Sequence, residues 1–311
     1  PLFQRSYYRF WVYGAVMASG LVLIILMFLN LFLHHSHSAF AHEVATLLGL
    51  ISAQVQQSSV WLALCAYLFA LVAYGSHQHS ALRISALVIV LLMGYCLLHL
   101  QAERVGLVVY ALGQGFALYR RCGWRWLCGG IVGIVFMLGC IIVIKPGAFN
   151  GRIGSSWQHL QAYWHNTNNE QNRAVFSISQ RLYYYRHSAV LFKQKPWVGF
   201  GTGTFRGSAN QLVTTPTLGG YQGNVENNFL TMLLQLGLIG LVLFAAFLSY
   251  LWRLGRQLPP LEREIMLGVI FITVWAAMSF AAFATNNIAS LFAIVIAACL
   301  GNVPILKNGG A

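Results

Sequence analysis

An acid stands at the start of a long apolar run in the last third of the chain. The stretch "NVENNFLTMLLQLGLIGLVLF" (224–244) places Glu226 among amides, directly before residues that are nearly all apolar. A carboxylate in that position is a candidate general base that takes a proton from a hydroxyl group. Negative charge also complements the dipole at a helix N-terminus. Because Asn224, Asn227 and Asn228 can cap the helix without a buried charge, both roles remain open for Glu226.

Two arginines in distant stretches have the chemistry to hold phosphate. Arg104 follows Glu103 in "QAERVGL" (101–107), between two apolar runs with almost no loop, and Arg181 lies in "SQRLYYYRHS" (179–188). One guanidinium group binds two phosphate oxygens at once, so two arginines that converge would hold a diphosphate without a metal ion. The alternatives are a local Glu103–Arg104 pair that closes the turn and, for Arg181, contact with lipid headgroups.

Other motifs suggest chemistry but lack the context it needs. The glycines of "GFGTGTF" (199–205) have no preceding strand and no following Lys-Ser/Thr pair, which excludes a nucleotide-binding loop. We interpret the histidines of "HHSHSAFAH" (34–42) as plain polar residues, and the six cysteines, all in or beside apolar runs, as buried free thiols. We therefore predict no disulfide, no metal ion and no cofactor.

The composition is that of a membrane protein. Hydrophobic residues make up 58% of the 311 residues and charged residues 8%, against about 25% charged in soluble domains. The net charge of +13 arises from 19 Lys and Arg against six Glu, and the chain contains no Asp. We predict no nucleic-acid partner, because the aromatic residues lie in apolar runs and not in a basic groove. Membrane lipid is the expected surrounding of most of the chain.

The apolar runs predict an all-α polytopic membrane protein with about eight transmembrane helices. A shorter apolar run within 36–58 is interpreted as an interfacial or re-entrant helix. Since the chain begins at Pro1 without an initiator Met, we expect an N-terminal part to precede it. The predicted spans are 10–33, 59–75, 82–100, 104–119, 124–144, 229–251, 265–285 and 288–306.

Basic residues in short loops predict the orientation. With eight crossings, the basic groups near Arg9, at 119–126, at 252–264 and at Lys307 all lie on the cytoplasmic side. The chain then divides into an N-terminal transmembrane bundle (1–144), a periplasmic loop (145–228) and C-terminal transmembrane helices (229–311).

One segment of the periplasmic loop has a helical pattern. In "SISQRLYYYRHSAVLFKQK" (177–195), apolar residues recur at spacings of three and four, which predicts an amphipathic helix on the membrane surface. Pro196 ends this helix, and an irregular glycine-containing turn follows. The predicted stripe consists of Ile178, Leu182, Tyr185, Ala189 and Phe192.

Together these motifs resemble the O-antigen ligase and O-antigen polymerase superfamily, which includes bacterial O-oligosaccharyltransferases. The stretch 179–205, followed by "NVENNFLTMLLQLGLIGLVLF", is similar to the family pattern of an Arg, an aromatic residue, a Pro-Gly turn and an "N-P-H-N" helix start. "QAERVGL" and "FATNNIASLF" (283–292) resemble further family elements. The family's His corresponds to Glu226 here and its Pro to Val225.

The resemblance implies a GT-C-like fold with a large periplasmic loop. It implies a metal-independent, inverting glycosyltransferase of the bacterial inner membrane, with its active site on the periplasmic face. The donor would be a glycan on undecaprenyl diphosphate, and the acceptor lipid A–core or another glycan. By position, Glu226 would be the base, and Arg104 and Arg181 would hold the diphosphate. Further candidates for substrate binding are Arg186, Lys193, Lys195, Tyr184, Tyr185, Trp197 and Asn227.

Several alternatives remain open at this stage. Ligase, polymerase and protein O-oligosaccharyltransferase share a donor and differ in their acceptors, which leave no short motif. A non-catalytic transporter or binder of lipid-linked glycan is the alternative from another class. A transporter is expected to carry broken helices in paired halves, and we find no internal repeat.

Overall fold

The computed structural model describes most of the predicted apolar runs. The described residues are 6–34, 55–75, 79–100, 104–126, 128–129, 177–202, 227–279, 282–284 and 286–301, and within them every regular element is a helix. The elements are α1 (Ser6–His34), α3 (Val55–Ala73), α4 (Ser80–Tyr95), the π-helix η2 (Cys96–Leu100), α5 (Arg104–Cys122), α10 (Ser177–Gln194), α12 (Asn228–Gly255), α13 (Pro260–Ser279), the 3₁₀ helix η5 (Ala282–Ala284) and α14 (Asn286–Leu300).

These helices have the length and composition of membrane-spanning helices, as the sequence predicts. Within the described residues, three helices are long and apolar enough to cross a bilayer, namely Tyr7–Asn30, Ser80–Leu98 and Asn228–Gly255. Two shorter apolar helices, Ser59–Ala73 and Asn287–Leu300, match two further predicted spans. The predicted runs at 124–144 and 36–58 lie outside the described residues, apart from a few at their ends. The total of eight crossings and the periplasmic loop stay predictions.

The chain separates into two compact units. Unit 1 comprises Pro1–Leu127, Leu248–Ala276 and Ala282–Ala311, and unit 2 comprises Cys128–Phe247 and Ala277–Ala281. The two units are defined by which residues pack together, whereas the three regions predicted from the sequence are defined by their place relative to the membrane. The chain passes from unit 2 to unit 1 within α12.

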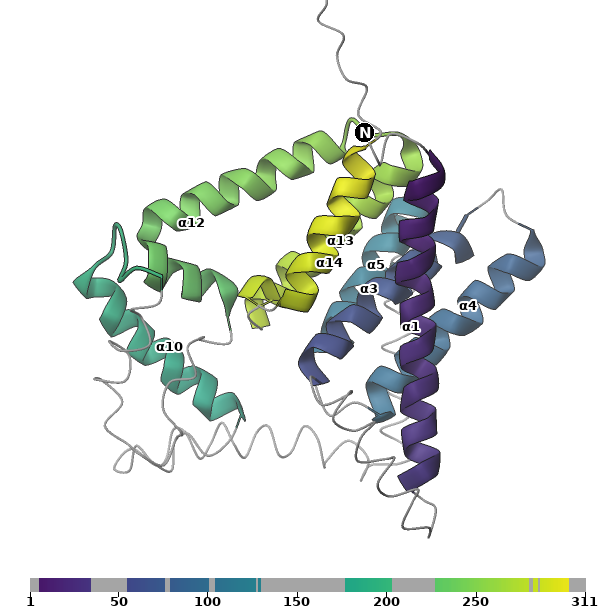
Figure 1. Cartoon of the computed structure of the whole chain (residues 1–311), viewed down its shortest axis with the longest axis horizontal. Coiled ribbons are helices and arrows are strands. Elements are labelled where there is room, and N and C mark those ends of the chain that lie inside the picture. Colours follow the sequence, from purple (N-terminus) through teal and green to yellow (C-terminus); the bar gives the residue numbers. More distant parts are fainter. Residues whose placement is uncertain are drawn as a thin grey trace, which may run out of the picture. The chain divides into compact units, whose positions relative to one another are not determined.

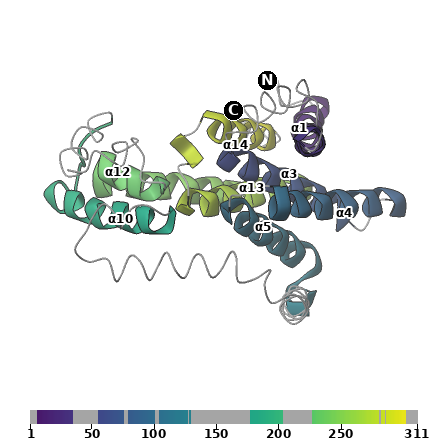
Figure 2. The same cartoon turned by 90° about the horizontal axis from the view of Figure 1, so that it is seen from below.

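Unit 1 is built around α3. This helix is almost wholly buried and packs against α1, α4 and α5, while α14 packs against α1 (Figures 1 and 2). The close contacts depend on small residues, as is usual between membrane helices. A Cβ on Gly106 of α5 would overlap Ser59, and one on Gly268 of α13 would overlap the ring of Tyr67. The cores of these interfaces therefore tolerate no larger side chain.

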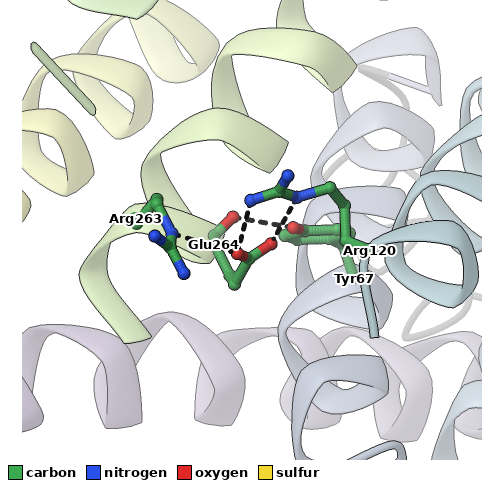
Figure 3. Close-up of polar contacts among 4 residues, drawn as sticks. All are labelled: Tyr67, Arg120, Arg263 and Glu264. Carbon is green, nitrogen blue, oxygen red and sulfur yellow. Dashed lines mark hydrogen bonds and ion pairs between the residues drawn. The ribbon is translucent and has the colours of Figure 1, made fainter. Parts of the chain in front are cut away.

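At one end of unit 1, basic residues gather around a buried acid (Figure 3). Glu264 of α13, whose side chain is 7% exposed, accepts hydrogen bonds of 2.6 and 2.9 Å from Arg120 at the end of α5. These hydrogen bonds raise the pKa of Arg120. Arg263 lies 3.4 Å from the same carboxylate, and the Tyr67 hydroxyl donates to the Glu264 backbone carbonyl at 2.7 Å.

A second ion pair lies at the same end. Arg9 near the start of α1 lies 3.3 Å from Glu262 at the start of α13. The start of α1, the end of α5 and the start of α13 therefore meet, as the predicted orientation requires of three of its four basic groups.

The described cysteines are free. Their burial is only partly as expected. Cys65, Cys96 and Cys299 are buried, whereas Cys122 is exposed and Cys128 is half-buried. Cys122 is the last residue of α5, where the helix leaves the packed core of unit 1.

Candidate functional site

The most distinctive feature of unit 2 is a break in α12. The sequence predicts one uninterrupted span over 229–251, but Gly237 has φ +68° and ψ −168°, which is not helical. The bend is visible in Figure 1, where α10 runs beside the N-terminal part of α12, as it also does in Figure 2. A helix broken in this way leaves backbone N–H and C=O groups unpaired, and in an apolar surrounding each of them is costly.

The turn after α10 supplies the missing hydrogen bonds. In an unbroken helix Leu238 N–H would donate to Leu234 C=O. Instead Leu238 donates to Pro196 C=O at 2.8 Å, and Leu234 accepts from Phe200 N–H at 2.9 Å.

The next pair of helical positions repeats the exchange. Ile239 N–H donates to Trp197 C=O at 3.3 Å, and Gln235 C=O accepts from Gly201 N–H at 2.8 Å. The turn 196–201 therefore replaces two successive backbone hydrogen bonds of the helix, the one from Leu238 to Leu234 and the one from Ile239 to Gln235.

Two glycines make this exchange possible. A Cβ on Gly237 would overlap the backbone of Trp197, and a Cβ on Gly199 would lie 2.6 Å from the carbonyl oxygens of Leu234 and Gln235. Both glycines also have positive φ, +68° and +65°, which other residues rarely adopt. We call the turn 196–201 together with the break at 234–239 the interlock. It fixes the end of α10 to the middle of α12.

The start of α12 is capped by an amide. The Asn227 Oδ1 accepts a hydrogen bond of 3.0 Å from Leu230 N–H, which is the usual N-cap geometry. The Asn227 Nδ2 donates to the Met278 carbonyl at 2.9 Å, near the end of α13 and within the same unit. The side chain that we predicted to bind substrate thus has a structural role as well. Because Asn227 fills the cap, the helix does not need Glu226 for that purpose.

The charged residues of α10 lie on two different faces. Arg181 is half-buried and shares a stripe with half-buried Tyr185 and fully buried Ser188, whereas Arg186 and Lys193 are exposed. Arg181 also interacts with neighbouring groups. The structure therefore separates Arg181 from the two cations that were predicted as weaker helpers.

The predicted helix is confirmed, whereas its place on the membrane surface stays a prediction and one position of its apolar stripe is wrong. α10 ends at Gln194, just before Pro196 as predicted. Ala189 is exposed, and the buried positions are Ser188 and Leu191, at 0% and 1%. The small Ser188 side chain permits close packing on the face next to the one that the apolar pattern indicates.

The remaining candidates in the turn have distinct surroundings. The Lys195 ammonium lies 5.3 Å from the centroid of the Phe200 ring, within range of a cation–π contact. Trp197 and Val198 at the tip of the turn are 64% and 67% exposed. Trp197 thus gives its carbonyl to the interlock while its ring stays accessible to lipid or substrate.

Not every predicted site residue can be compared with the others. Arg104 is the first residue of α5, in unit 1, and Tyr184 lies on α10, in unit 2. Glu226 lies outside the described residues. The convergence of Arg104, Arg181 and Glu226 therefore stays a prediction.

Sequence reasoning missed two features of the molecule. The signal for the break was present, since Gly237 is a glycine inside a helical pattern. The buried network of Glu264 and Arg120 was also missed, because the basic loop residues were assigned to orientation alone.

The fold and these motifs define the class of the protein. It is a helical membrane protein in which a Pro-Gly turn, preceded by a basic amphipathic helix, is built into a broken apolar helix. The family model described as O-antigen ligase matches residues 86–245, which is about half of the chain. The protein belongs to this family, whose members are glycosyltransferase-like enzymes of the O-antigen ligase and polymerase type. A comparison with curated proteins found no match.

Proposed function

We propose that the protein transfers a glycan from undecaprenyl diphosphate to a hydroxyl group of lipid A–core, on the periplasmic face of the inner membrane. The observation that carries this proposal is the extent of the family match. Residues 86–245 include Arg104, α10, the interlock, Glu226 and the start of α12. All three proposed catalytic residues thus fall within the matched region.

Glu226 acts as the general base. Its carboxylate takes the proton of the acceptor hydroxyl, whose oxygen forms a bond to the anomeric carbon of the glycan. The bond between that carbon and the phosphate oxygen breaks, and undecaprenyl diphosphate leaves from the opposite side, so the configuration at the anomeric carbon inverts. The Asn227 cap supports this role, because α12 then does not need the Glu226 carboxylate as its N-cap.

Arg104 and Arg181 stabilise the negative charge that develops on the departing diphosphate. Arg181 suits this role better than Arg186, since it is half-buried while Arg186 is exposed.

The test is glycan transfer by variants of the full chain, read from lipopolysaccharide banding and from transfer in reconstituted membranes. Glu226→Gln is expected to lower the rate by about 10²- to 10⁴-fold, and Arg181→Gln by about 10²- to 10³-fold. Arg186→Gln should cost less than tenfold, because that side chain lies on the exposed face of α10.

A matched control keeps the result specific. Glu170→Gln removes another acid of the same long loop and should leave transfer unchanged. If both Glu226→Gln and Arg181→Gln transfer at the wild-type rate, the proposed roles are refuted, and a non-catalytic binder of lipid-linked glycan becomes the better description.

The acceptor is tested by deletion of the gene. A ligase is expected to leave lipopolysaccharide without any O-chain. Chains of a single repeat would instead identify a polymerase. Normal lipopolysaccharide together with an unglycosylated protein would identify a protein O-oligosaccharyltransferase.

A further inference from the structure

Unit 1 contains a pocket that the proposed transfer reaction does not use. Its volume is about 290 Å³, and it lies at the end of the unit that holds the buried ion pairs. Side chains of α1, α3 and α13 form its walls, and nearly all of them are apolar. They include Phe10, Met17, Leu68, Leu71, Leu261 and Ile265.

One charged residue lines the pocket. Arg121, in the last turn of α5, is exposed and contributes to the lining. The Tyr13 ring also lines the pocket, but its hydroxyl is engaged with the Cys299 sulfur at 3.4 Å. The pocket therefore combines mostly apolar walls with a single cationic group.

The acids near this end are already paired. Glu262, next to the lining residue Leu261, binds Arg9, and Glu264 binds Arg120 and Arg263. Among the described residues, no carboxylate lies within ion-pair distance of Arg121. Within the part of the chain that the structure describes, the charge of Arg121 is therefore available to a ligand.

We propose that this pocket binds an anionic phospholipid, with an acyl chain against the apolar walls and the phosphate on Arg121. A guanidinium group binds two oxygens of one phosphate at once, which gives the charge of Arg121 a role in the pocket. A small free anion would leave the apolar walls unused, and in a zwitterionic lipid the cation of the headgroup already neutralises the phosphate that Arg121 would bind. The proposal does not depend on the transfer reaction.

The bound lipid has a structural consequence. The pocket is lined by four helices that are far apart in the sequence, so one lipid molecule would contact α1, α3, α5 and α13 together. A ligand that binds only the folded state raises its stability in proportion to the logarithm of its concentration. Anionic phospholipid should therefore stabilise unit 1 more than a zwitterionic lipid of the same chain length.

The experiment measures lipid retention by native mass spectrometry of the full chain purified in detergent. Phosphatidylglycerol is titrated against phosphatidylcholine with the same acyl chains. The wild type should bind phosphatidylglycerol about tenfold more tightly, as one charge-assisted contact provides. Arg121→Gln should abolish this preference. Leu261→Trp, which puts a larger side chain into the lining of the pocket, should weaken the binding of both lipids.

The matched control is Arg125→Gln, which removes an exposed cation four residues away that does not line the pocket. Its lipid binding should equal that of the wild type. An equal loss with Arg121→Gln and Arg125→Gln would mean diffuse surface charge and overturn the proposal. Unchanged binding by Leu261→Trp would also overturn it, as would displacement of the lipid by millimolar inorganic phosphate. Should Leu261→Trp fail to fold, Val72→Phe at another wall of the pocket provides the same test.

Discussion

Replacing Gly237 by Ala should release the turn 196–201 from α12. An Ala at this position must leave φ +68° and ψ −168°, a region that costs about 1–3 kcal/mol for residues with a Cβ. Its Cβ would also overlap the Trp197 backbone. The substitution therefore breaks the hydrogen bonds from Leu238 and Ile239 to the turn, at about 1 kcal/mol each.

The backbone strain of about 1–3 kcal/mol shifts the equilibrium towards the released turn by roughly 5- to 150-fold, and the overlap with Trp197 adds to this shift. α12 loses little, because a straight helix restores the bonds from Leu238 to Leu234 and from Ile239 to Gln235. The cost falls on the turn, whose Phe200 and Gly201 N–H groups lose their acceptors.

Hydrogen exchange of the full chain in lipid nanodiscs measures this release. The amides of Phe200 and Gly201 should exchange roughly 5- to 150-fold faster in Gly237→Ala than in the wild type. Gly199→Ala should have the same effect from the other side of the interlock. Gly14→Ala is the matched control, since a Cβ at Gly14 of α1 meets nothing within 4 Å. If the two amides stay protected in Gly237→Ala, the exchange of hydrogen bonds described here does not hold the turn.

Three further substitutions test other contacts. Asn227→Ala should destabilise α12 by about 1 kcal/mol in thermal unfolding, while Asn227→Asp keeps the cap; equal stability of all three proteins would contradict the cap. Glu264→Gln should lower the free energy of unfolding by about 1–3 kcal/mol, and in a double-mutant cycle with Arg120→Gln the losses should not add. Additive losses would show that the pair is not coupled. Gly268→Val should prevent close packing against Tyr67 and abolish a monodisperse folded species in size-exclusion chromatography; a normal elution profile would contradict this contact.

Features that depend on neighbouring residues were predicted well from the sequence. Apolar length alone placed the helices at 82–100 and 229–251, and Pro196 correctly marked the end of α10. The helical pattern of α10 was visible, although the buried face lies at Ser188 and Leu191. Local pattern reports how apolar residues are arranged, but the partner helix decides which face packs.

Features that depend on distant residues could not be predicted. The break at Gly237 is stable because the backbone groups that it frees form hydrogen bonds with residues about 40 positions upstream. Such hydrogen bonds produce no periodic pattern in the sequence. The Asn227 contact with the Met278 carbonyl spans 51 residues in the same way. For the candidate site, the residue types indicated cations and an acid, but the different faces of Arg181 and Arg186 required the structure.

The interlock also constrains how the protein is made. Residues 196–201 leave the ribosome before α12, so the partner of the bend already exists when α12 is synthesised. A bent α12 needs these replacement hydrogen bonds in lipid, because its own N–H and C=O groups at the break are otherwise unpaired. The order of synthesis therefore allows the bend to form as α12 enters the bilayer, against a turn that is already there.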